Sequence, residues 1–165
     1  QEFLISWLIN VHLTDGTYTY NLYQDGTPIA QNLNQTTYNN ASLNNNAANL
    51  FTVKTNYYGG ETDESNKAGF AKGNASIASL SLTANDQMTV TEGSQLTVSG
   101  TLSSTDPDNL ILENGAQLIH SSEGVQATVL KDIAPYTTDS DGWNFIASPG
   151  MVKTEGVILD IMKGK

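Results

Sequence analysis

Cysteine and arginine are both missing from this chain of 165 residues. Without cysteine the protein forms no disulfide and offers neither a thiolate nucleophile nor a zinc–thiolate site. The chain contains seven lysines and 17 acidic residues, which gives a formal net charge of −10. Because nucleic acids and anionic membrane surfaces bind clustered cationic side chains, this balance excludes nucleic acid as a partner. No apolar run approaches the roughly 18 residues of a membrane helix, so membrane insertion is not expected.

Imidazole side chains are scarce, since His12 and His120 are the only two histidines. A serine–histidine–aspartate triad needs a histidine within hydrogen-bond reach of its nucleophile and a carboxylate that orients it. The sequence has no G-x-S-x-G, H-E-x-x-H or phosphate-loop pattern that would bring such groups together. We therefore predict no catalytic residue and expect both histidines to occupy rim or strand positions.

Small polar residues dominate what is present, with 17 asparagines and 14 glycines in the chain. Apolar residues make up 38% of the sequence and charged residues 15%. Asparagine, serine and threonine hydrogen-bond to their own backbone, which disfavours helices and favours turns. The composition therefore predicts an all-β fold of short strands and many turns.

Residues 1–68 show short strands separated by turns. Residues 18–22 alternate between apolar and polar side chains, which is the period of a half-buried strand. Asp25-Gly26 predicts a hairpin turn, and Gly59-Gly60 predicts a second tight turn. On the strand at residues 49–58, the alternate residues from Phe51 to Tyr57 are expected to form the buried face and those from Leu50 to Asn56 the other face. This spacing of strands and turns is typical of a β-sandwich.

Three stretches of this section carry a family resemblance. They are I-S-W, T-Y-T-Y-N-L-Y-Q-D-G-T-P-I-A-Q-N-L-N-Q-T-T-Y-N-N-A-S-L and N-L-F-T-V-K-T-N-Y-Y-G-G-E-T-D-E-S. Together they resemble a fibronectin type III-like module of Bacteroidetes surface and secreted proteins, similar to the adhesin regions of gingipain-like proteases. The resemblance implies a fibronectin III/Ig-like β-sandwich with Trp7 in its core. It also implies a secreted or cell-surface, outer membrane-associated protein.

The chain departs from this family at its start, because the usual first strand is missing ahead of residue 2. We expect the natural N-terminus to lie upstream. The strand at residues 2–11 is unusually apolar, and an uncovered apolar edge pairs readily with another chain. We therefore predict that this edge, including Leu4 and Leu8, mediates self-association or is covered by the apolar tail at residues 157–162.

Residues 74–132 contain an internal repeat. The run M-T-V-T-E-G-S-Q-L-T-V from Met88 aligns with L-I-L-E-N-G-A-Q-L-I-H from Leu110. Short strands that repeat with a glycine corner are typical of stacked turns of a parallel β-solenoid. The second region is therefore predicted to be a short β-solenoid-like segment with the following neighbours on successive turns: Met88 with Leu110, Leu96 with Leu118, and Val98 with His120.

Residues 133–165 are predicted to form a β-hairpin or tail. The run W-N-F-I-A-S-P, which follows the turn at Asp141-Gly142, also resembles Bacteroidetes surface proteins, where such a strand opens a further β-domain. The sequence after Pro149 departs from that pattern, so we expect the chain to be truncated or diverged there.

Two aromatic and two acidic residues are the candidate binding residues. Tyr58 is expected to be exposed beside a turn, and it is a candidate for stacking on a sugar ring together with Trp143, although core packing also accounts for Trp143. Asp139 and Asp141 have a spacing that fits part of a calcium loop, but calcium needs six to eight oxygen ligands and turn chemistry also explains both. Calcium is the one cofactor for which the sequence offers candidate ligands.

The absence of an assembled catalytic constellation favours a non-catalytic extracellular binding or adhesion module, with a glycan or a host or cell-surface protein as partner. The alternative is a small secreted glycan-active enzyme, a glycoside hydrolase or polysaccharide lyase, that uses aspartate or glutamate side chains. Such an enzyme needs two carboxylates that face each other across a groove. A structural spacer that binds nothing is a third interpretation.

Overall fold

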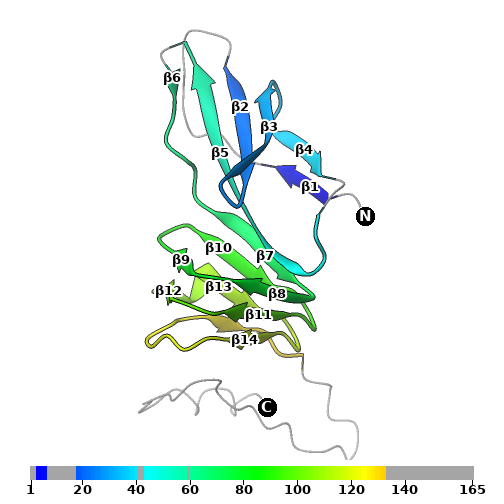
Figure 1. Cartoon of the computed structure of the whole chain (residues 1–165), viewed down its shortest axis with the longest axis vertical. Coiled ribbons are helices and arrows are strands. Elements are labelled where there is room, and N and C mark those ends of the chain that lie inside the picture. The colour runs from blue at the N-terminus through cyan, green and yellow to red at the C-terminus, as the bar shows by residue number, and fades with distance from the viewer. Residues whose placement is uncertain (1–2, 7–17, 41–42, 59, 133–165) are drawn as a thin grey trace, which may run out of the picture. The chain divides into compact units, whose positions relative to one another are not determined.

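The computed structural model describes residues 3–6, 18–40, 43–58 and 60–132. These residues all belong to one unit of the chain, residues 1–132. The predicted all-β fold is confirmed, because the described residues form short strands throughout (Figure 1), and the 3₁₀ turn η1 (Pro107–Asn109) is the only helical element among them. Trp7, Leu8 and His12 lie outside the described residues, so the predictions for them stay untested.

The first described strands are antiparallel. β2 pairs with β3 and β5, and β5 also pairs with β6. Their bounds are β2 (Thr19–Gln24), β3 (Thr27–Leu33), β5 (Ala47–Tyr57) and β6 (Gly60–Glu61). A separate two-stranded sheet joins β1 (Phe3–Ser6) to β4 (Thr37–Asn40).

Both predicted turns connect paired strands. At the β2–β3 turn, Asp25 and Gly26 have φ values of 51° and 76°. Positive φ at both central residues gives the turn whose twist matches that of the flanking strands, and glycine adopts it without strain. At the second turn Tyr57 pairs with Gly60, so β5 and β6 form the expected hairpin.

The rest of the described chain forms a stacked region, residues 68–129, in which successive turns of chain lie parallel to one another. The first turn contains β7 (Ala68–Lys72), β8 (Asn74–Ile77) and β9 (Leu80–Leu82), and the second contains β10 (Gln87–Val90), β11 (Gln95–Val98) and β12 (Leu102–Ser104). The third contains β13 (Leu110–Leu112) and β14 (Gln117–Ile119), and β15 (Thr128–Val129) follows. Strands at the same position of each turn pair in parallel.

The register within the stacked region follows the sequence repeat. Met88 pairs with Leu110 and Leu96 with Leu118, which confirms two of the three predicted neighbours. The third, Val98 with His120, stays a prediction because β14 ends at Ile119.

Glycine recurs at the corner between the first two strands of a turn because the backbone there is left-handed. Gly93 and Gly115 have φ values of 66° and 72°, a conformation that side chains with a Cβ rarely adopt. The corner therefore explains why both copies of the repeat carry glycine at this position.

One sheet joins the antiparallel strands to the stacked region. Its order is β15-β13-β10-β7-β5-β2-β3, with β6 beside β5. The first half of β5 pairs with β7 and the second half pairs with β2 (Figure 1). The boundary that the sequence suggests near residue 68 therefore falls inside a continuous sheet, and β5 covers the edge of β7 that would otherwise be open. Stacked repeats need such a cap at their ends.

The buried side chains lie on opposite faces of this sheet in the two regions. Opposed residues of paired strands share a face. Leu50 is opposite Gly69 and packs against the core of the stacked region. Phe51 points the other way and is also buried, as is Leu22 on β2. The residues of the stacked core are Ala48, Ala71, Ala75, Leu80, Leu82, Met88, Val90, Leu96, Val98, Leu102, Leu110 and Leu112.

This change of face corrects the expectation for the strand at residues 49–58. Leu50 and Thr52 were expected on an open face, but Leu50 packs against the stacked core and Thr52 is buried. Tyr57 was expected on the buried face, yet it is 42% exposed. It is the last residue of β5, and its partner strand β6 is only two residues long.

Candidate functional site

An open groove of about 640 Å³ crosses the face of the sheet that points away from the stacked core. Residues of β7 and β10 make up most of its lining, together with β1, Phe51 of β5, and Glu113, which follows β13. The groove therefore extends over the outer faces of β7 and β10.

Strand alternation places the floor residues. Ala71 and Met88 point into the stacked core and are fully buried. Phe70 and Thr89, one residue away along their strands, point to the opposite face, since successive side chains of a strand alternate. Phe70 pairs with Thr89 and Thr89 pairs with Ile111, so these side chains lie side by side across three strands.

Two aromatic rings give the groove an apolar surface. The centroids of the Phe51 and Phe70 rings are 6.5 Å apart, with their planes tilted by 36°. Phe51 is 7% exposed, which fixes its ring, whereas Phe70 is half-buried and presents part of its ring to the groove. Gln87 and Thr89 lie beside them and offer an amide and a hydroxyl group.

The charged residues of the groove lie at one border. Lys72 ends β7, and Glu92 and Glu113 follow the ends of β10 and β13. Glu113 Oε2 accepts a hydrogen bond from the Glu92 backbone N–H at 2.9 Å, and Glu92 Oε1 accepts one from Asn114 Nδ2 at 3.4 Å. Both carboxylates thus accept hydrogen bonds that join the corner after β10 to the corner after β13.

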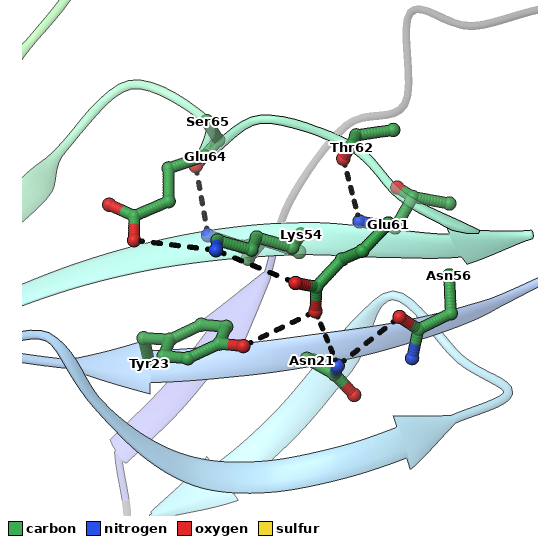
Figure 2. A network of polar contacts seen from close by, with 10 residues as sticks. Asn21, Tyr23, Lys54, Asn56, Glu61, Thr62, Glu64 and Ser65 are labelled. Carbon is green, nitrogen blue, oxygen red and sulfur yellow. Dashed lines mark hydrogen bonds and ion pairs between the residues drawn. The ribbon is translucent and has the colours of Figure 1, made fainter.

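A second polar cluster lies on the opposite face of β2 and β5. Figure 2 shows Glu61 of β6 between side chains of β2 and β5. Its Oε1 accepts hydrogen bonds from Asn21 Nδ2 at 2.7 Å and from Tyr23 Oη at 3.3 Å, and its Oε2 lies 3.5 Å from Lys54 Nζ. The Lys54 ammonium also lies 5.3 Å from the centroid of the Tyr23 ring. The cluster fastens the β5–β6 hairpin to β2.

This environment keeps Glu61 ionised. The hydrogen bond from Asn21 is the main cause that lowers the pKa of Glu61, and the charge of Lys54 adds to it, while desolvation opposes the shift. A glycosidase acid needs a raised pKa so that it holds a proton near neutral pH. Glu61 is therefore unsuited to that role.

Asp86 is a buried carboxylate at the corner between the first two turns, where it is 5% exposed. Its oxygens accept hydrogen bonds from the backbone N–H of Lys67 at 2.7 Å and of Thr83 at 2.9 Å, and Lys67 Nζ lies 3.9 Å away. Burial acts to raise the pKa of Asp86, but these hydrogen bonds and the Lys67 charge outweigh it and hold the pKa below its usual value. Asp86 thus ties successive turns together and stays ionised.

Asp25 has the opposite shift, because burial raises the pKa of its carboxyl group although a backbone hydrogen bond acts against it. Asp25 Oδ1 accepts that bond from the Leu50 N–H at 3.0 Å, and the Asp25 N–H donates to the Leu50 carbonyl at 2.8 Å. The residue therefore joins the β2–β3 turn to β5, and it does not line the groove.

The residues singled out from the sequence are only partly described. Tyr58 is fully exposed at the β5–β6 hairpin, as expected, but it does not line the groove. Trp143, Asp139 and Asp141 lie outside the described residues. Within residues 3–132, as far as the structure describes them, no group of three or more acidic or histidine side chains could hold a metal ion. The described part likewise contains no helix that is long and apolar enough to cross a membrane.

The groove itself was not predicted. The run A-G-F-A-K at residues 68–72 contained the signal, because small residues at Gly69 and Ala71 alternate with the aromatic Phe70. That pattern places Phe70 away from a tight core, but the face it joins depends on β10, which lies 15 or more residues further along.

Comparison of the chain with protein-family models, with curated proteins and with solved structures found no match.

Proposed function

We propose that this chain is a non-catalytic extracellular binding module of a bacterial surface protein and that it binds carbohydrate in the groove. The observation that carries the proposal is the pair of rings, Phe51 and Phe70, that lines an open groove together with Gln87 and Thr89. The surface location is supported by the likeness to fibronectin III-like modules of Bacteroidetes.

The chemistry of the groove suits a sugar. A pyranose ring has an apolar face of C–H groups and a periphery of hydroxyl groups. Aromatic rings pack against such apolar faces, while a few placed polar groups fix the orientation of a ligand. The half-buried ring of Phe70 supplies the first element, and the Gln87 amide and Thr89 hydroxyl supply the second.

The carboxylates near the groove favour binding over hydrolysis. Inverting and retaining glycosidases both need one protonated carboxyl and one ionised carboxylate on either side of the bond that breaks. Glu113 instead accepts a backbone hydrogen bond from Glu92 on the same border of the groove. A binding module needs no such pair, and it is expected to release no reducing ends from a polysaccharide that it binds.

A glycan array tests the proposal. The purified chain is applied with and without Ca²⁺, together with Phe70→Ala and the matched control Tyr58→Ala, which removes an exposed aromatic ring outside the groove. We expect glycan binding by the original chain and by Tyr58→Ala, and a loss of about tenfold or more in affinity for Phe70→Ala, which corresponds to about 1.4 kcal/mol. Circular dichroism confirms that each variant is folded.

Several results would overturn the proposal. If no glycan binds, or if a protein ligand binds and is insensitive to Phe70→Ala, the groove is not a carbohydrate site. Release of reducing ends from a bound polysaccharide would instead support the glycan-active enzyme. Binding that Tyr58→Ala abolishes and Phe70→Ala leaves intact would move the site to the β5–β6 hairpin.

A further inference from the structure

The side chain of Asn114 joins three successive levels of the stacked region. Its Nδ2 donates a hydrogen bond to Glu92 Oε1 at 3.4 Å. Its Oδ1 accepts hydrogen bonds from Lys131 Nζ at 3.3 Å and from the Asp132 backbone N–H at 3.4 Å. Glu92 lies in the corner after β10, whereas Lys131 and Asp132 follow β15. The carboxamide group of Asn114 is therefore held from both sides, with two donors on its oxygen.

The residue after Asn114 is the glycine of the left-handed corner. Asn114 is the only one of the 17 asparagines that precedes a glycine. Gly115 is exposed, and a Cβ added to it would meet no atom closer than 3.8 Å. The Ala116 N–H donates to the Glu113 carbonyl at 2.9 Å, which places Asn114 and Gly115 at the two central positions of a turn. Within the part of the chain that the structure describes, the Gly115 N–H donates no backbone hydrogen bond, so it can lose its proton to a solvent base.

An asparagine followed by glycine can react with its own backbone. The Gly115 nitrogen bonds to Asn114 Cγ as the N–H proton passes to a solvent base, and the bond from Cγ to Nδ2 breaks. The amino group takes a proton from water and leaves as ammonia. Water then opens the cyclic succinimide at either carbonyl carbon and leaves an aspartate or a β-linked isoaspartate. The balance is one water consumed and one ammonia released, with no oxidant and no cofactor.

The groups around Asn114 favour this attack. Because glycine has no Cβ, the peptide group between the two residues can rotate toward the Asn114 side chain. Negative charge develops on Oδ1 as the Gly115 nitrogen attacks, and donors already aimed at such an oxygen stabilise the transition state. The Lys131 ammonium and the Asp132 N–H are these donors, and the charged one is the stronger.

From these features we propose that Asn114 is a modification site, at which the folded chain converts this asparagine to aspartate or isoaspartate with the help of Lys131. The conversion replaces the donor to Glu92 with a second carboxylate and gives Lys131 an ionic partner. These charges are near the surface, where single ion pairs contribute little to stability. The modification is therefore detected by mass and charge rather than by thermal unfolding.

Peptide mapping by mass spectrometry tests the proposal. The purified full chain is incubated at neutral pH, and conversion at Asn114 is followed over time with the other asparagines as internal controls. We expect Asn114 to convert faster than any other asparagine, with release of ammonia that Asn114→Gln abolishes. Lys131→Gln is expected to slow the conversion about tenfold, whereas Lys131→Arg, which keeps a charged donor, retains the original rate. Circular dichroism confirms that the variants are folded.

The same incubation in urea separates the effect of the fold from that of the local sequence. Once the chain is unfolded, the contact with Lys131 is lost, so the original chain, Lys131→Gln and Lys131→Arg should convert Asn114 at one rate. If the folded chain keeps its amide while the unfolded chain loses it, the corner protects Asn114 and the proposal is wrong. If folded Lys131→Gln converts as fast as the original chain, or is slower than it in urea as well, the contact between Lys131 and Oδ1 does not promote the reaction.

Discussion

The stacked region makes a quantitative prediction about two leucines at the same position of successive turns. Leu96 on β11 is fully buried and has Ala75 as its neighbour on one side and Leu118 on the other. Leu118, on β14, has Leu96 as its neighbour on one side and is only partly buried. Truncation of each leucine to alanine therefore removes the same atoms from two environments that differ in burial.

The expected cost follows from the atoms removed. Leucine to alanine deletes three carbon atoms, worth about 2.4 kcal/mol at about 0.8 kcal/mol per buried CH₂. At Leu96 the neighbour Ala75 is too small to fill the space, so a cavity cost raises the total to about 3–4 kcal/mol. At Leu118 water can enter and part of the side chain is already exposed, so we expect about 1–2 kcal/mol.

Urea denaturation followed by circular dichroism measures both values. Leu96→Ala is expected to lower the free energy of unfolding at least twice as much as Leu118→Ala. The loss at Leu96 would be a large part of the roughly 5–15 kcal/mol that stabilises a typical domain. Equal losses, or a larger loss at Leu118, would show that the third turn is as enclosed as the second and would refute this reasoning.

Three further predictions concern single residues. Asp86→Asn is expected to lower the free energy of unfolding by about 1–3 kcal/mol at neutral pH. The pKa of Asp86 in the folded protein lies below its usual 3.8, so the carboxylate stabilises the fold above pH 3.8 and this stabilisation is lost as the pH falls through the folded pKa. The free energy of unfolding should therefore depend less on acid pH in the variant. Gly69→Ala should destabilise the fold by about 1–3 kcal/mol, because a Cβ there would collide with the backbone carbonyl of Asn49, and thermal unfolding measures it. Leu4, 63% exposed on β1, is expected to mediate self-association, so Leu4→Lys should lower the molar mass measured by light scattering.

Each of these has a contradicting result. If the free energy of unfolding changes with acid pH in the same way for the original chain and for Asp86→Asn, the Asp86 carboxylate does not stabilise the fold as described. An unchanged melting temperature for Gly69→Ala would mean that β5 does not approach β7 as closely as described. A monomeric original chain would show that Leu4 does not mediate self-association.

Local patterns in the sequence predicted the local features of the fold. The Asp25-Gly26 turn could be predicted because few residues adopt two successive positive φ angles. The register of Leu96 with Leu118 could be predicted because stacked turns repeat the same side chain at the same position. These features depend on neighbours in the sequence or on an internal repeat.

The features that the sequence did not reveal depend on how distant strands meet. β5 is 11 residues long and pairs with β7 through one half and β2 through the other. Alternation along β5 alone predicts one buried face, so it assigned Tyr57 to the buried side and Leu50 to the open side. Phe70 was missed for the same reason, because a single aromatic residue in a short strand does not show which face of the sheet it joins.

Nuclear magnetic resonance titration tests the central claim most directly. With ¹⁵N-labelled protein and the neutral oligosaccharide that binds best, we expect the largest amide shifts on β7 and β10, around Phe70 and Thr89, and little change at Tyr58. Shifts confined to the β5–β6 hairpin, or no shifts at saturating concentrations of any neutral or charged oligosaccharide, would contradict the account of the groove as a carbohydrate-binding site.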